Sequence, residues 1–359
     1  MIHQYEPKFD VADLNTRFVS YFQSGGFCTE YKKTEEFENK IKEFLGVKYC
    51  FVVNNGTISL SLALLALGIK PGAKVAVPDL TMIATPNAVR LIGAVPIFVD
   101  IEPDTLCMDI SKLRELTDVD GIKAVIYVSL NGRCSNNISW LKHASIPVID
   151  DAAQSFGSQL PFGVYCGTQS EIGSFSFSMP KIITTGQGGC LVTDDDDLAT
   201  KIKHLKDFGR DKGGIDNHPY FGINSKFTEL QALVGLSQIK DLEWRIQRKR
   251  DLYVLYRDNL KDVREVTVIE TKLEYQVPWF IDILANDRDR LVAYLKDRGI
   301  GTRVIYPPIH TQESYNIQQD FPVTSSVCAR GLWLPSSLTL SDNDIITICN
   351  AIKEFYNEH

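Results

Sequence analysis

Short apolar runs alternate with amphipathic stretches along the first two thirds of the chain. Apolar runs rich in β-formers predict strands at residues 49–53, 74–77, 97–100, 124–129 and 148–150. Helical spacing of the apolar positions predicts helices at residues 57–67, 85–92 and 110–116. Strands that alternate with helices are typical of a mostly parallel sheet covered by helices, so we expect an α/β fold.

The pattern changes near residue 173. Serine and phenylalanine alternate over residues 174–178, which predicts a strand with phenylalanines on one face and hydroxyls on the other. A strand at residues 189–193 can pair back with it across the turn at residues 184–188. The acidic run at residues 194–197 then predicts the start of a helix, because carboxylates suit the positive end of the helix dipole.

The last third predicts a second, smaller unit. A long helix is expected over residues 228–260, where Thr228 and Gln231 have capping-box spacing. We expect it to lead from a large domain, residues 1–245, into a smaller α+β domain, residues 246–359. The pattern of the smaller domain predicts one strand and two helices, at residues 281–284, at residues 287–297 and from Asp342 onward.

Composition excludes several classes of protein. The 359 residues carry 38 basic and 45 acidic side chains, so a net charge of −7 disfavours binding to nucleic acid through bulk positive charge. One basic cluster on the long helix could still bind nucleic acid. Pairing of its side chains with nearby acidic residues is the favoured interpretation. The cluster consists of Arg245, Arg248, Lys249 and Arg250.

The same composition indicates a cytoplasmic protein. The N-terminus has no signal-peptide pattern, and the longest apolar stretch, residues 58–69, is too short to span a bilayer, so we expect no membrane association. The eight cysteines are scattered without a CxxC pair, which predicts reduced thiols and no metal site.

Polar residues that follow predicted strands are the candidates for chemistry, because ligands of α/β sheets bind at the strands' carboxyl ends. One strand continues into Asp151, and another continues into residues 54–57, where a helix start can bind an anion. Lys181 follows a third strand and precedes a glycine-rich turn. Each feature alone is weak, since a lysine is usually a surface charge and an aspartate a helix cap. Together they match the phosphate anchor, ring-nitrogen partner and amine that pyridoxal phosphate requires.

Several ordered motifs resemble one family over nearly the whole chain. The sequence is similar to the DegT/DnrJ/EryC1/StrS family of nucleotide-sugar aminotransferases, which are fold-type I pyridoxal phosphate enzymes. The central matches are DDAAQ at residues 150–154, GSFSF at 173–177 with Lys181, and TTGQGG at 184–189. Flanking matches lie at residues 37–38, 45–47, 55–57, 81–88, 222–227 and 306–310.

The resemblance implies a role for each residue of a cofactor site. Lys181 would form the Schiff base with the cofactor aldehyde and would then move the proton. Asp151 would pair with the pyridinium nitrogen, and Gln154 would lie close to the ring. The phosphate would be bound by Gly56, Thr57 and Ser176.

The resemblance also implies the substrates and the assembly. Glutamate would donate an amino group to C4 of a nucleotide-linked 4-keto-6-deoxyhexose. The active site would lie at the interface of a homodimer, with Asn224 reaching the phosphate of the neighbouring subunit. Candidates for the sugar diphosphate are Arg210 and Lys212, with Lys226 and Arg303 behind them, and candidates for the sugar are Tyr306 and His310.

Three departures from the family pattern bear on the cofactor and sugar pockets. Met82 replaces an aromatic residue that commonly packs near the cofactor, so a thioether contact would replace stacking. Residues 131–133, Asn-Gly-Arg, stand where Tyr-Gly is common, which affects the sugar pocket. Asp150 replaces a frequent glutamate, and we expect no consequence for Asp151.

Alternatives to C4 amination remain open. Amination at C3 is the closest one. A sugar dehydratase of this family would carry histidine in place of Lys181, and that substitution is absent. A regulatory or structural protein that binds pyridoxal phosphate without turnover is disfavoured, because it would not need Lys181, Asp151 and Ser176 together.

Overall fold

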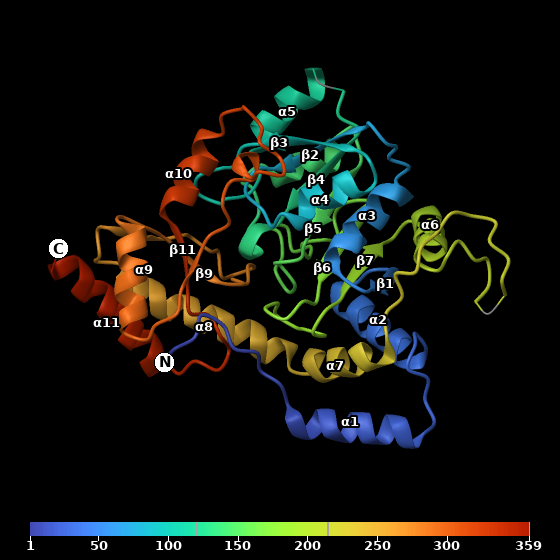
Figure 1. Cartoon of the computed structure of the whole chain (residues 1–359), viewed down its shortest axis with the longest axis horizontal. Helices are drawn as coiled ribbons and strands as arrows, with labels where there is room; N and C mark the ends of the chain where they lie inside the picture. The colour runs from blue at the N-terminus through green and yellow to red at the C-terminus, as the bar shows by residue number, and fades with distance from the viewer. Residues whose placement is uncertain (120, 214, 359) are drawn as a thin grey trace.

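The structure of the chain is a computed structural model that describes residues 1–119, 121–213 and 215–358. Its centre is a seven-stranded sheet in the order β1-β7-β6-β5-β4-β2-β3 (Figure 1). Only β7 runs antiparallel to its neighbours, so the predicted mostly parallel, mixed sheet is confirmed. The strands are β1 (Tyr49–Val53), β2 (Lys74–Pro78), β3 (Val95–Val99), β4 (Ala124–Val128), β5 (Val148–Asp151), β6 (Ile172–Ser176) and β7 (Gly189–Thr193).

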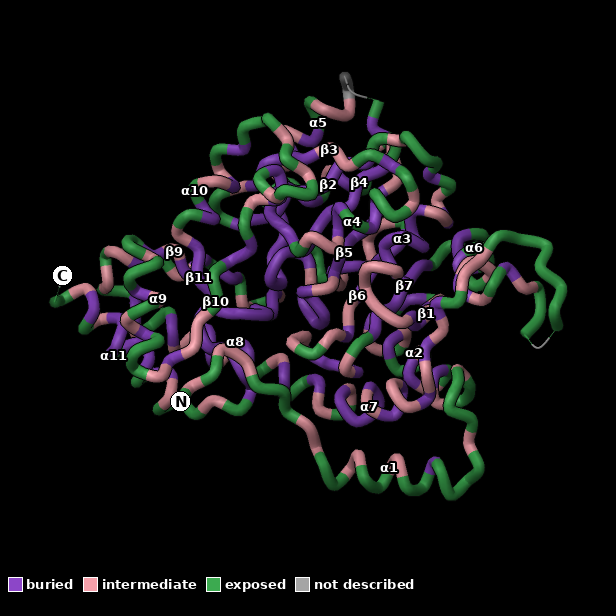
Figure 2. The backbone as a smooth tube through the Cα atoms, in the orientation of Figure 1, coloured by how far each residue is buried: buried purple, intermediate pink, exposed green. Residues whose placement is uncertain are grey.

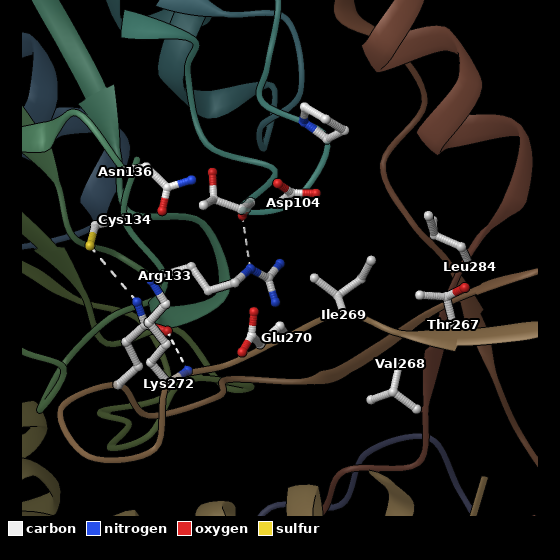
Figure 3. Close-up of a pocket in the computed structure, with 13 residues that line it drawn as sticks. Asp104, Arg133, Cys134, Asn136, Thr267, Val268, Ile269, Glu270, Lys272 and Leu284 are labelled. Carbon is white, nitrogen blue, oxygen red and sulfur yellow. Dashed lines mark hydrogen bonds between the residues drawn. The ribbon is translucent and has the colours of Figure 1, made fainter. Parts of the chain in front are cut away.

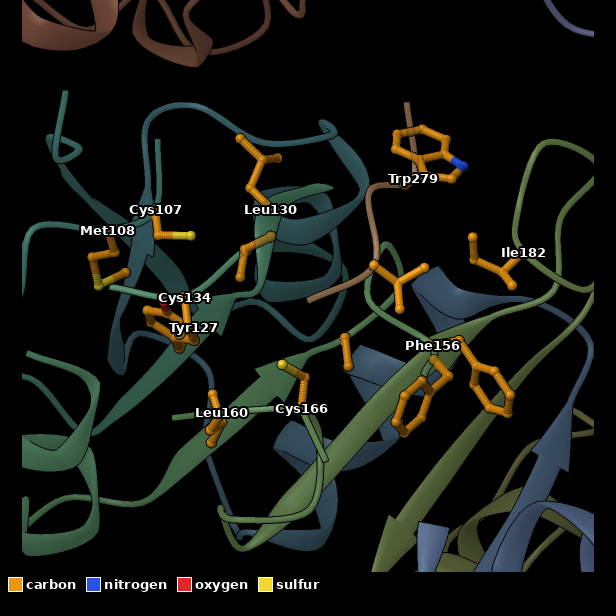
Figure 4. Close-up of a cluster of buried hydrophobic side chains, with 14 of the residues drawn as sticks. Cys107, Met108, Tyr127, Leu130, Cys134, Phe156, Leu160, Cys166, Ile182 and Trp279 are labelled. Atoms are coloured by element: carbon orange, nitrogen blue, oxygen red, sulfur yellow. The ribbon is translucent and has the colours of Figure 1, made fainter. Parts of the chain in front are cut away.

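Helices cover both faces of this sheet, as its nearly continuous apolar strands require. On one face α3 (Gly56–Ala66), α4 (Ala84–Leu91) and α6 (Asp196–Lys206) bury an apolar cluster against the strands. On the other face α2 (Lys32–Leu45), α5 (Ile110–Val119) and α7 (Glu229–Ile239) close a second cluster. Figure 2 shows the strands between these layers as buried, and Figure 4 shows part of the second cluster, from Cys107 to Trp279.

A smaller antiparallel sheet forms the second unit, in the order β10-β11-β9-β8. Its strands are β8 (Val266–Val268), β9 (Ile281–Ala285), β10 (Arg303–Val304) and β11 (Gly331–Leu334). The helices α8 (Leu242–Leu260), α9 (Arg288–Asp297) and α11 (Asp342–Glu358) bury a third apolar cluster with it. The α+β character is confirmed, and the proposed boundary at residue 245 stays a prediction.

Short helices and the N-terminal arm complete the chain. They are α1 (Val11–Gln23), α10 (Pro322–Arg330) and the 3₁₀-helices η1 (Leu130–Gly132), η2 (Ile138–His143) and η3 (Ile309–Thr311). The first residues lie against the second unit, because Ile2 bridges to Ile300 between α9 and β10. Within the described residues, none of the helices is at once long and apolar enough to cross a membrane.

Local signals explain where the predicted helices begin. Thr228 and Gln231 form the predicted capping box at α7, and Asp195 caps α6 within the acidic run. The single helix predicted over residues 228–260 is wrong, because the chain breaks between α7 and α8 at Lys240 and Asp241. There Lys240 pairs with Asp10 of the N-terminal arm at 2.9 Å, and no proline or glycine marks the break in the sequence.

The basic cluster on α8 does not form a positive surface. Arg245 donates to the carbonyl of Lys8, and Arg248 donates to the carbonyl of Leu340 and pairs with Asp342. Lys249 and Arg250 likewise donate to main-chain carbonyls, of Trp279 and Gln276 respectively. Bonds to other segments thus take the place of the pairing within the helix that the sequence favoured.

Candidate active site

A cavity of about 370 Å³ opens at the carboxyl ends of the central strands. Because only β7 is reversed, β1, β5 and β6 run in the same direction, and the residues that follow them meet at one edge. The cavity is lined by eight of the predicted site residues, Gly56, Thr57, Met82, Asp151, Gln154, Ser176, Lys181 and Tyr306, and also by Arg303.

Lys181 lies in the turn after β6 and is half-buried. Its Nζ lies 4.2 Å from the centroid of the Trp279 ring, a cation–π contact. Burial lowers the pKa of Lys181 to about 8, while the charge of Asp151 opposes this shift and that of Arg303 adds to it. A larger fraction of this amine is therefore neutral near pH 7 than for an ordinary lysine.

Asp151 ends β5 and is buried. Its Oδ2 accepts a hydrogen bond of 2.8 Å from the Thr85 hydroxyl, which is itself 3.0 Å from the Thr81 hydroxyl. Burial raises the pKa of Asp151, and the Thr85 bond and the charge of Lys181 counteract that effect. The result is a carboxyl group fixed in orientation and within the electrostatic reach of Lys181.

The start of α3 forms a cradle with Ser176. Asn55 caps the helix by accepting a hydrogen bond of 2.9 Å from the Ile58 amide. A Cβ atom at Gly56 would lie only 3.0 Å from the Cβ of Ser176, so glycine allows the backbone to approach this serine. Backbone amides, the helix dipole and a hydroxyl together suit a phosphate group.

These groups fit pyridoxal phosphate. A cradle for the phosphate, a buried carboxyl group for the ring nitrogen and a lysine with a lowered pKa line one cavity. Met82 also lines it and is 43% exposed, so its thioether is available for contact with a ligand.

Residues 131–133, which depart from the family pattern, lie beside this cavity. They are not among the described residues that line it. The Asn131 amide donates to Gln154 Oε1 at 3.0 Å, and the Asn131 side chain makes two hydrogen bonds with the backbone of Phe280. Arg133 is buried and pairs with Asp282 of the smaller sheet at 2.5 Å, beside a separate pocket of about 440 Å³ (Figure 3). This segment therefore joins the two sheets and orients Gln154.

Five predicted residues are not among the described residues that line this cavity: Arg210, Lys212, Asn224, Lys226 and His310. Arg210 pairs with Asp216 at 2.8 Å, and Lys212 is exposed. Asn224 is also exposed, whereas His310 is buried with its Nδ1 2.6 Å from Asp79 Oδ2. Their roles toward cofactor and sugar stay predictions, as do those of the residues within the cavity.

Two cavity residues that contact Asp151 and Lys181, Thr85 and Trp279, were not singled out by sequence. Thr85 lies one helical turn after Thr81 in the segment that resembles the family, and this spacing is the signal that could have indicated paired hydroxyls. Trp279 has no such local signal, because its partner Lys181 is distant in the sequence.

The chain is similar to known aminotransferases over most of its length. The sequence profile described as the DegT/DnrJ/EryC1/StrS aminotransferase family matches residues 10–353. The GDP-perosamine synthase of Escherichia coli O157:H7 is 38% identical over 331 residues, which cover 90% of each chain. The UDP-2-acetamido-2-deoxy-3-oxo-D-glucuronate aminotransferase of Pseudomonas aeruginosa is 33% identical over 328 residues, 88% of this chain and 89% of that protein.

A solved structure agrees with these matches. The crystal structure of a DegT DnrJ EryC1 StrS aminotransferase from Brucella abortus has a TM-score of 0.89 and 30% identity, and the match covers 96% of this chain and 95% of that one. The expected fold type I is thus confirmed, and a cofactor-binding protein without turnover is set aside. The chain belongs to the DegT/DnrJ/EryC1/StrS aminotransferase family, and it is a pyridoxal phosphate-dependent nucleotide-sugar aminotransferase.

Proposed function

We propose that the chain transfers the amino group of glutamate to C4 of a nucleotide-linked 4-keto-6-deoxyhexose, as in the synthesis of perosamine. The observation that carries the transamination is the meeting of Lys181, Asp151 and the Gly56 cradle in one cavity. The choice of sugar rests on the 38% identity with a GDP-perosamine synthase, which favours GDP as the nucleotide.

The residues of the cavity divide the work of holding the cofactor. Gly56, Thr57 and Ser176 would bind the phosphate, and Gln154, which also lines the cavity, would lie near the ring. Asp151, oriented by Thr85, keeps the ring nitrogen protonated. Bound pyridoxal phosphate supplies an aldehyde that exchanges amino groups and a ring that accepts electrons.

Lys181 has two tasks in this proposal. Its neutral amine is the covalent partner of the cofactor aldehyde in the resting enzyme. When an amino substrate takes its place, the same Nζ would be free to take a proton from one carbon and to return it to another. The lowered pKa of about 8 suits both tasks, because it increases the neutral fraction at working pH.

The sugar nucleotide enters beside Tyr306 and Arg303. Tyr306 is buried with its ring edge against Trp333, and Arg303 is exposed with its guanidinium 5.7 Å from the Tyr306 ring. Arg303 offers the diphosphate a positive charge inside the cavity, whereas Arg210 and Lys212 lie on the chain between α6 and α7.

Amination at C3 is the second candidate. The 33% identity with an aminotransferase whose name specifies a 3-oxo sugar supports it. The two candidates differ only in which carbon of the sugar is presented to the cofactor.

We further propose a homodimer with the active site at the subunit interface. The chain between α6 and α7 extends away from the body of the molecule (Figure 1). Four large apolar side chains are exposed there among the described residues: Phe208, Ile215, Tyr220 and Phe221. Such side chains are suited to burial against a second subunit, where Asn224 would reach the partner's phosphate.

Borohydride reduction tests the assignment of Lys181. The reduced holoenzyme is digested, and we expect the cofactor on the peptide that contains Lys181. Lys181→Ala is expected to bind the cofactor only loosely and to lose several orders of magnitude in turnover. Lys40→Ala, which loses only an exposed ion pair with Glu43 on α2, is the control. Attachment to any other lysine would refute the assignment.

A panel of sugars tests the substrate. GDP-, UDP- and dTDP-linked 4-keto and 3-keto sugars are incubated with glutamate, and the aminated carbon is located by NMR. We expect the GDP-linked 4-keto-6-deoxyhexose to react with the highest kcat/KM. Preference for a 3-keto sugar would replace C4 with C3, and a failure of glutamate with every sugar would contradict the proposed donor.

A further inference from the structure

Lys249 on α8 is a buried lysine that the proposed reaction does not use. Only 2% of it is exposed, and its Nζ donates to the Trp279 carbonyl at 2.7 Å and to the Ser336 carbonyl at 2.5 Å. Its ammonium also lies 5.7 Å from the centroid of the Phe280 ring. Among the described residues, no carboxylate forms an ion pair with it, so its bonds are to two main-chain segments of the smaller unit.

Burying a lysine without an acidic partner lowers the stability of a folded protein. Burial, together with the charge of Arg245, lowers the pKa of Lys249 to about 7. An apolar side chain of similar volume would fill the space without the cost of desolvating an amine. The function of Lys249 should therefore follow from the two carbonyl groups that it binds.

One of these contacts leads directly to the active site. Trp279, whose carbonyl Lys249 binds, is 2% exposed and donates its indole N–H to the Pro180 carbonyl at 2.6 Å. Its ring stacks on Phe280 at 3.9 Å and presents a face to Lys181 Nζ at 4.2 Å. The indole is thus fixed through its backbone, through its nitrogen and across one face.

We propose that Lys249 is a positioning residue that holds Trp279 against Lys181, so that the indole excludes water from the reactive amine. The proposal rests on the role of Lys181 given above. Trp279 touches that amine, and Lys249 acts on it only through Trp279.

The groups around Lys181 determine what a change at Lys249 does. Besides the Trp279 face, Asp151 and Arg303 act on this amine, and neither bonds to Lys249. Burial is the largest cause of the lowered pKa of Lys181. A displaced indole would admit water and return that pKa toward its ordinary value.

The test measures the titration of Lys181 in the full-length chain without cofactor. Trace labelling with acetic anhydride over a range of pH, followed by mass spectrometry of the Lys181 peptide, gives a midpoint that we expect at about 8. In Lys249→Met the midpoint is expected to rise by about one pH unit or more. Trp279→Leu is expected to raise it as well, and the double variant should not add the two shifts.

Arg248→Met is the matched control. Arg248 lies beside Lys249 on α8 and also donates to a carbonyl, but its contacts are with Leu340 and Asp342. We expect it to leave the midpoint unchanged. Should Lys249→Met fail to fold, Lys249→Gln, too short to bridge both carbonyls, is expected to give the same upward shift.

An unshifted midpoint in a folded Lys249 variant, or an equal shift in Arg248→Met, would overturn the proposal. Borohydride trapping of the wild-type holoenzyme separates this failure from that of the proposed function. Cofactor trapped on Lys181 together with an unshifted midpoint refutes only the role of Lys249. Cofactor trapped on another lysine refutes the proposed function, whatever the titration shows.

Discussion

Among single residues, Lys181 carries a prediction about pH. Only its neutral amine attacks the cofactor aldehyde, and burial lowers its pKa to about 8. Below that pH, the rate at which the cofactor-free chain captures pyridoxal phosphate should rise about tenfold per pH unit, and above it the rate should level off. Stopped-flow absorbance measures this rate. A rate that climbs without a plateau to about 10.5 would indicate an ordinary lysine.

Asp151 carries a second prediction at the same scale. In Asp151→Asn the amide cannot hold a proton on the ring nitrogen, so kcat should fall by about 100-fold to 10,000-fold. The melting temperature should not fall, because a buried amide costs less than a carboxyl group whose pKa burial has raised. Asp150→Asn, whose carboxyl binds Ser129 and Gly167, is the control and should keep kcat within a few-fold. Equal losses in both variants would contradict the assigned role.

The residues in and beside the cavity differ in how far sequence could reveal them. Asp151 ends β5 and Gly56 begins α3 shortly after β1, so local pattern places both residues at the sheet edge. Asn131 could be recognised only as a departure, because the Phe280 backbone that it binds lies 149 positions away. Trp279 likewise acquires its role only when two sheets meet. Contacts of this kind depend on tertiary packing, and no local periodicity encodes them.

Between elements, the buried pair of Arg133 and Asp282 connects the loop after β4 with β9 of the smaller sheet. The guanidinium donates to both carboxylate oxygens, at 2.9 and 2.5 Å, and both residues are buried. Arg133→Met would leave Asp282 buried without a partner. We expect a loss of about 3–5 kcal/mol in the free energy of unfolding, measured by urea denaturation.

The double variant Arg133→Met/Asp282→Leu tests the reason for this loss. Removing both charges should recover most of the stability, because no uncompensated charge remains. If the double variant is as unstable as the single one, the loss came from packing or from the bond of Arg133 to the Thr105 carbonyl. Alternation and capping predicted the strands and helices that this pair joins, but not the pair itself, which like the break at Lys240 belongs to their assembly.

At the scale of the whole molecule, the sequence pattern predicts the active-site cavity but not the exposed apolar surface between α6 and α7. The strand directions bring the polar segments after β1, β5 and β6 to one edge of the central sheet. The net charge of the chain is −7, so attraction of an anionic substrate depends on single positive groups at the cavity, such as Arg303. The chain between α6 and α7 is largely exposed (Figure 2), and the strand pattern does not account for its exposed apolar side chains, which the folding of one chain does not bury. The proposed second subunit would bury them.

Phe221→Asp tests that explanation at the scale of the assembly. The wild-type chain should sediment at about twice 40.3 kDa, and a charge at Phe221, which is 69% exposed, should shift it toward the monomer. Activity should fall with dimer content, because Asn224 is proposed to act in the neighbouring site. Ile346→Asp, on the exposed side of α11, introduces the same charge at a partly exposed apolar position and should change neither property. A fully active wild-type monomer would show that one chain completes the site without a partner, and Asn224 would then have no role in binding the cofactor.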